Sequence, residues 1–143
     1  MIPSRIVGVL LMFIGVAAAA LGAYGALATA RIAGLVGGAV TGLNLADWKL
    51  HWVRACLALL AAGLCELVGG GWVYSRRATG YILAGVGPLW LVCYSWFARP
   101  HYAYERLDRV ETALLVCLGA VCFAAFLFDR GTRSAPEERA HSA

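Results

Sequence analysis

Long apolar runs separated by short polar segments dominate this chain, and the runs have the length of membrane-spanning helices. The four longest hold at most two charged residues each and cover residues 6–30, 53–74, 80–98 and 112–128. An α-helix rises about 1.5 Å per residue and the hydrocarbon core of a bilayer is about 30 Å thick, so about 20 apolar residues cross it. The pattern therefore predicts four transmembrane helices in a single membrane domain, residues 1–128.

The composition indicates the same class of protein. Of the 143 residues, 62% are hydrophobic and 14% charged, and the mean hydropathy is +0.74. Soluble domains average about 45–50% apolar and about 25% charged residues, and a chain this small leaves too much surface to hide such an excess from water. We therefore predict an all-α integral membrane four-helix bundle in contact with lipid, multi-pass, in a bacterial inner membrane or an organelle inner membrane.

The first run has a second interpretation. Arg5 gives a basic start and residues 28–30 have the A-x-A form of a cleavage site, as in a secretory signal peptide. The apolar run of 25 residues is longer than the 7 to 15 residues of an ordinary signal-peptide core. This length favours a retained helix.

Small residues recur at helical spacing in two places. Glycines seven residues apart line one side of the first run and predict the close approach of another helix: Gly8, Gly15 and Gly22. The next apolar segment, residues 32–46, is too short to cross a membrane, and its glycines stand four apart: Gly34, Gly38 and Gly42. This segment is predicted either as a helical extension or re-entrant piece packed on another helix, or as a glycine-rich interfacial loop.

Pro88 lies near the middle of the third run. Proline has no main-chain N–H, so it leaves the carbonyl one turn earlier without its helical donor. In a membrane a neighbouring group has to satisfy that carbonyl. We therefore predict a helix kink at Pro88.

Glu66 is the charged residue predicted to lie deepest in the membrane. It lies just past the centre of the run 53–74, about 4 Å from its midpoint by the helical rise. An ionisable residue at this depth indicates a functional site, here a proton or cation site. Two structural interpretations stay open: the carboxyl group is protonated and hydrogen-bonded inside the bundle, or the helix ends at residues 69–71 and leaves Glu66 near the interface. Arg54, about 18 Å away along the same helix, is too far to pair with it.

The sequence contains no established catalytic or metal-binding motif. The five cysteines lie inside apolar runs without paired spacing, as small hydrophobic residues do. His51 and His101 flank the second and third runs and are the candidate ligands for a haem or transition metal, but neither lies inside a run, so interfacial polar residues are the plainer interpretation. We predict no enzyme activity, no metal and no cofactor beyond lipid contacts. The basic residues are scattered, which predicts no nucleic-acid partner.

The features that remain indicate assembly with other chains. Lys and Arg divide six to six between the two predicted sides, so the positive-inside rule assigns no orientation. The polar tail, residues 129–143, has no large apolar residue and is predicted to be disordered unless a partner holds it. With a glycine-faced first helix and no motif, this predicts a non-catalytic accessory or structural subunit of a larger membrane complex, for example an energy-transducing one. The alternative is a small homo-oligomeric proton-coupled transporter or channel that uses Glu66.

Overall fold

The computed structural model describes residues 4–36, 45–97 and 107–140, and within these ranges it contains helices and no strand. The four helices are α1 (Ser4–Val36), α2 (Leu45–Tyr74), α3 (Thr79–Phe97) and α4 (Arg109–Ala140). All four are long and apolar enough to cross a membrane, over Ser4–Ile32, Asp47–Tyr74, Thr79–Phe97 and Arg109–Arg130. The predicted all-α four-helix membrane bundle is confirmed.

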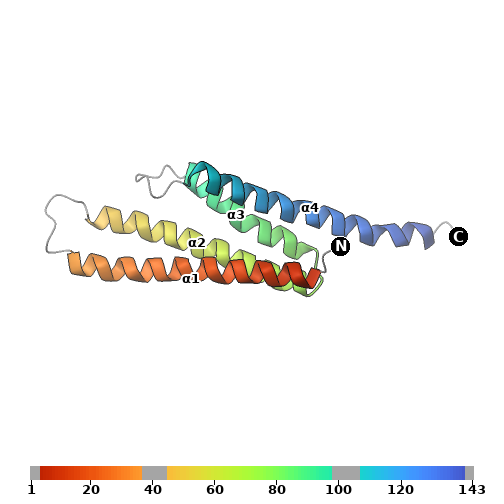
Figure 1. Ribbon diagram of the computed structural model, residues 1–143, viewed down its shortest axis with the longest axis horizontal. Helices are drawn as coiled ribbons and strands as arrows, with labels where there is room; N and C mark the ends of the chain where they lie inside the picture. The colour runs from red at the N-terminus through yellow and green to blue at the C-terminus, as the bar shows by residue number, and fades with distance from the viewer. Residues whose placement is uncertain (1–3, 37–44, 98–106, 141–143) are drawn as a thin grey trace.

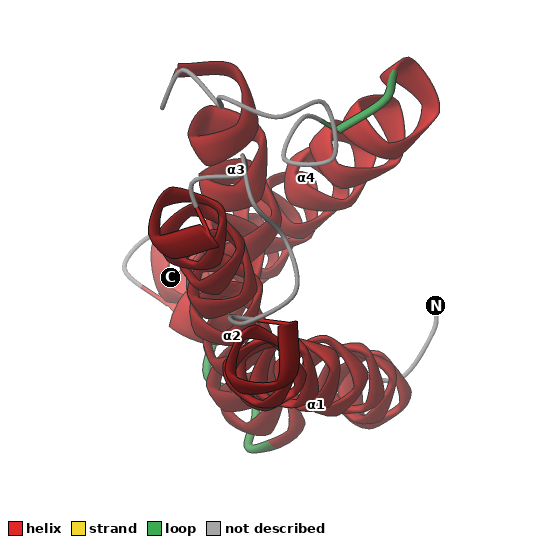
Figure 2. Cartoon of the chain, turned by 90° about the vertical axis from the view of Figure 1, so that its left-hand side faces the viewer, coloured by secondary structure: helices red, strands yellow, loops and turns green. Residues whose placement is uncertain are grey.

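The helices pack in chain order, and each runs antiparallel to the one before it (Figure 1). Extensive contacts join α1 to α2, α2 to α3 and α3 to α4. Viewed end-on, the four helices follow an open arc, with α1 and α4 at its two ends (Figure 2). The start of α1, the turn between α2 and α3, and the end of α4 all lie at the same end of the bundle (Figure 1).

The helices extend beyond the predicted runs. α2 begins at Leu45 instead of residue 53, because the boundary residues belong to its first turns: Trp48 and Trp52 stack with ring centroids 6.3 Å apart. α1 continues to Val36, so the start of the segment 32–46, including Gly34, is a helical extension. Gly38 and Gly42 lie outside the described residues.

The polar tail is helical as far as Ala140, where the sequence analysis predicted disorder in the absence of a partner. α4 passes the end of its membrane span at Arg130 and continues to Ala140. Prolonging a helix that already exists requires no new nucleus, so a polar sequence can follow the membrane segment as helix. This part of α4 extends past the end of the other helices (Figure 1).

Glycines bring the backbones of α1 and α2 into direct contact. A Cβ atom at Gly8 would lie 2.6 Å from the Tyr74 nitrogen, one at Gly15 would lie 2.6 Å from the Gly63 oxygen, and one at Gly22 would lie 2.6 Å from the Cys56 oxygen. Side-chain carbons do not approach other atoms so closely. These glycines therefore lie along the line where the two helices touch.

The same seven-residue spacing recurs on the facing helices, where the sequence analysis did not identify it. On α2, Gly63 and Gly70 lie against α1, while Gly69 lies against α3. On α3, a Cβ at Gly80 would lie 2.6 Å from the Gly69 oxygen, and one at Gly87 would lie 2.6 Å from the Ala62 oxygen. A sustained seven-residue spacing is typical of helices that wrap around each other in a left-handed supercoil.

α4 joins the bundle along one narrow seam. Gly85 of α3 faces Gly119 and Cys122 of α4. At this level the four helices meet in one buried cluster: Leu11, Val73, Tyr81, Ala84 and Cys122. At the other end of α3, the Leu107 nitrogen donates to Ser95 Oγ at 2.7 Å, and Trp96 Nε1 donates to Thr112 Oγ1 at 3.2 Å.

A capping box starts α4, three residues before the predicted run. The Glu111 nitrogen donates to Asp108 Oδ1 at 2.7 Å, and the Asp108 nitrogen donates to Glu111 Oε2 at 3.1 Å. Each side chain thus satisfies a main-chain donor that the helix leaves free.

We expect Asp108→Ala to lower the free energy of unfolding by about 1 kcal/mol, because the first turn of α4 loses its cap. Unfolding in mixed detergent and sodium dodecyl sulfate, followed by circular dichroism, measures this loss. Arg109→Ala, at an exposed neighbour outside the cap, is the matched control and should change stability little. Equal effects of the two substitutions would contradict a capping role.

Candidate functional site

Glu66 is buried in the bundle, with 4% of its surface exposed. α2 continues without a break from Leu45 to Tyr74. The interpretation in which the helix ends at residues 69–71 is therefore wrong. Because α2 starts earlier than predicted, Glu66 lies about 8 Å from the middle of the span by the helical rise, toward the turn that follows Tyr74.

The packing of α2 determines the direction in which Glu66 points. Gly63 and Gly70 contact α1, whereas Ala62 and Gly69 contact α3. Glu66 lies three or four residues from each of these four positions, so it shares their side of the helix. Its side chain therefore lies between the α1 and α3 contacts.

The carboxyl group of Glu66 is not fully hydrogen-bonded. Its Oε2 atom is buried and has no hydrogen-bond partner among the described residues. Cys122 of α4 lies close enough for a charge on Glu66 to act on its thiol. A buried polar atom left without a partner costs about 1–3 kcal/mol, and more when it is charged. Glu66 is thus a group that this fold retains at an energetic cost.

No cation faces Glu66 from the neighbouring helices where the structure describes them. α1 carries no charged residue between Arg5 and Arg31, and α3 carries none from Thr79 to Phe97. Between Glu111 and Asp129, α4 is also free of charge. An ion pair within the described bundle is therefore excluded, which leaves a proton, a small ion or a group from outside the chain.

The structure describes no site that contains both His51 and His101. His51 Nε2 lies 3.3 Å from Asp47 Oδ1 on the same helix, and His101 lies outside the described residues. Among the residues that the structure describes, no three His, Cys, Asp or Glu side chains form a group that could hold a metal ion.

Pro88 lies inside α3 and is fully buried. α3 continues through it to Phe97. The proline therefore does not end the helix, and it places a main-chain carbonyl without its helical donor inside the bundle.

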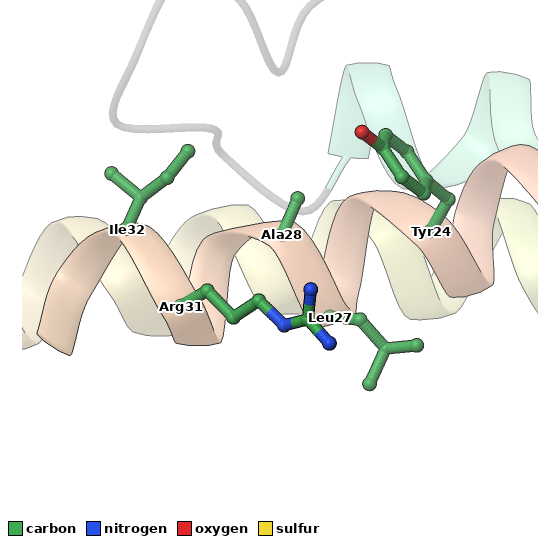
Figure 3. A pocket seen from close by; sticks show the side chains of 5 residues that line it. All are labelled: Tyr24, Leu27, Ala28, Arg31 and Ile32. Atoms are coloured by element: carbon green, nitrogen blue, oxygen red, sulfur yellow. The ribbon is translucent and has the colours of Figure 1, made fainter. Parts of the chain in front are cut away.

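A shallow groove of about 330 Å³ lies on α1 near its C-terminal end (Figure 3). All its lining residues come from this one helix: Tyr24, Leu27, Ala28, Arg31 and Ile32. The Arg31 guanidinium lies at the end of a membrane span, where basic side chains anchor helices at the interface. Because no buried polar group lines the groove, we assign it no chemistry.

The fold and the site together define a multi-pass membrane protein with a buried carboxyl group inside a four-helix bundle. Comparison with known proteins finds no matching family model, no matching curated protein and no matching solved structure. The buried carboxyl group and the arrangement of the helices are therefore the basis for assigning a function.

Proposed function

We propose that this chain is a non-catalytic subunit of a larger membrane assembly, such as an accessory subunit of an energy-transducing complex. The observation that supports this proposal is the position of α4. Only 11% of its span is buried, against 44% for α2. Among the residues that the structure describes, its extensive contacts are with α3.

The polar end of α4 adds to this support. Beyond Arg130 the helix leaves the span and extends past the other helices (Figure 1). Gly131 and Pro136 both lower the helix propensity of this segment, so its helical state is marginal in water. A second protein packed against it would supply the stabilisation that the segment lacks on its own.

We expect the tagged full-length chain to copurify with partner chains in mild detergent, and a chain that ends after Arg130 to lose at least nine-tenths of them. The reason is that the truncation removes the polar end of α4 but keeps all four spans. Size-exclusion chromatography with light scattering and mass spectrometry measure both species. A full-length chain that is stable and monodisperse as a single copy would overturn the proposal.

A second proposal, a small homo-oligomeric proton-coupled transporter or channel, is favoured by the buried Oε2 atom of Glu66. In this case the copurifying chains are copies of the same protein. Mass spectrometry of the purified assembly distinguishes the two proposals directly. A buried carboxyl group fits proton coupling because it changes charge within the membrane.

A further inference from the structure

Pro88 frees one main-chain carbonyl in the interior of the bundle. The carbonyl of residue i in a helix accepts from the nitrogen of residue i+4, and Pro88 has no N–H to offer Ala84. Ala84 is completely buried, with 0% of its surface exposed. A polar atom in this position needs a donor from another helix.

Glu66 lies at the same depth as this carbonyl. On α2 it falls between two contact points with α3: Ala62 faces Gly87, and Gly69 faces Ala84. These two contacts bracket the turn of α3 that contains the freed carbonyl. The side chain with an unpartnered oxygen and the carbonyl without its helical donor therefore lie at the same level of two helices in direct contact.

We propose that Glu66 is a proton-binding site of the membrane bundle, and that its neutral carboxyl group donates a hydrogen bond to the main-chain carbonyl of Ala84. This inference goes beyond the proposed subunit role, because it concerns the chemistry of one side chain and holds for any partner chain. A protonated carboxyl group has one O–H donor, which is what the freed carbonyl requires.

The surroundings favour a proton over a metal ion. Hard cations bind several oxygen ligands at once. Residues 6–30, 79–97 and 112–128 of the neighbouring helices contain no second carboxylate, and the buried cluster that contains Ala84 is apolar apart from the Tyr81 hydroxyl and the Cys122 thiol. A proton needs only one acceptor.

The titratable groups near Glu66 are few and can be tested separately. α1 contributes none at this depth, α3 contributes the Tyr81 hydroxyl, and α4 contributes the Cys122 thiol. The next residue on α2, Cys65, is a free thiol. The other charged residues of α2, Arg54 among them, lie about 18 Å or more away along the axis.

A hydrophobic carbodiimide tests the proton directly. Dicyclohexylcarbodiimide reacts with a protonated carboxyl group: the acid proton moves to a carbodiimide nitrogen, the carboxyl oxygen bonds to the central carbon, and the adduct rearranges to an N-acylurea. We expect membranes that contain the full chain to give one adduct at Glu66, mapped by mass spectrometry, and its yield to fall at least tenfold as the pH rises. Glu66→Gln should give none, and the exposed Glu111 is the internal control carboxylate.

Two outcomes would overturn the proton site. The first is no adduct on Glu66 at any pH, although the same chain reacts when it is unfolded in sodium dodecyl sulfate. The second is a yield that does not change with pH, which would mean that the proton never exchanges.

Pro88→Ala tests the acceptor. Alanine restores an N–H for the Ala84 carbonyl, so the neutral form of Glu66 loses its acceptor and the midpoint of the pH dependence should fall by about half to one pH unit. Gly71→Ala, which meets no atom within 4 Å, should leave the midpoint unchanged. A midpoint shifted by Cys122→Ala or Tyr81→Phe but unaffected by Pro88→Ala would overturn the assignment of the Ala84 carbonyl.

Discussion

Gly15→Leu is expected to destabilise this protein strongly. A Cβ atom at this position meets the main chain of α2 at the Leu67 nitrogen, and it would lie 2.6 Å from the Gly63 oxygen. Main-chain atoms cannot rotate away, so α1 and α2 have to separate along their line of contact. Overpacking costs about 1–3 kcal/mol when side chains can adjust, and we expect a loss at or above the upper end of this range.

Unfolding in mixed detergent and sodium dodecyl sulfate measures the loss, and Gly15→Ala should show a smaller loss in the same direction. The matched control is Gly71→Ala, because a Cβ atom there meets no atom within 4 Å. Both helices stay in contact in this control, so its stability should stay close to that of the original chain. Equal stability of Gly15→Leu and Gly71→Ala would contradict a direct contact between the backbones of α1 and α2.

The sequence predicted the number and type of the helices well, because both follow from long apolar runs. It placed the start of α2 and the two ends of α4 less well, because most of the residues that extend these helices are polar or aromatic. Asp108 and Glu111 are residues of a kind common in exposed loops, yet together they form the cap of α4. Trp48 and Trp52 are residues of a kind common at the membrane boundary, yet they belong to α2.

The pairing of the helices was predictable only in part. The glycines of α1 indicate that some helix approaches closely, but their spacing alone does not identify α2 as that helix. The partner glycines have the same spacing, seven residues between Gly63 and Gly70 and between Gly80 and Gly87. Thr29 continues the series on α1; it is buried and donates to the Gly25 carbonyl at 2.7 Å. A search for matched spacings along the whole chain would have found these residues.

The position of Glu66 inside a membrane span was predictable from the sequence, but its distance from the middle of the span and its surroundings were not. Its neighbours Ala84 and Cys122 come from two other helices. Their proximity depends on the register of α2 against α3 and of α3 against α4. This register is determined by contacts between glycine backbones, which leave no hydrophobic or charged pattern in the sequence.

Replacing Glu66 by methionine is expected to raise the free energy of unfolding by about 1–3 kcal/mol, because the cost of burying the carboxyl group exceeds the gain from its one hydrogen bond to the Ala84 carbonyl, and methionine leaves a side chain of similar length. Glu66→Gln should stay close to the stability of the original chain, since its amide can still donate to the Ala84 carbonyl. Unfolding in mixed detergent measures both variants beside Leu64→Met, an exposed position on the same helix.

The same two variants are expected to lose every proton-dependent activity of the assembly, because neither side chain binds and releases a proton in the physiological range. In reconstituted vesicles, a proton-coupled transporter should lose at least nine-tenths of its driven flux while it still assembles. A stabilised but inactive Glu66→Met variant would identify Glu66 as a residue retained for function at the expense of stability. If Glu66→Met is less stable than the original chain and Glu66→Gln retains full activity, the carboxyl group serves the structure alone.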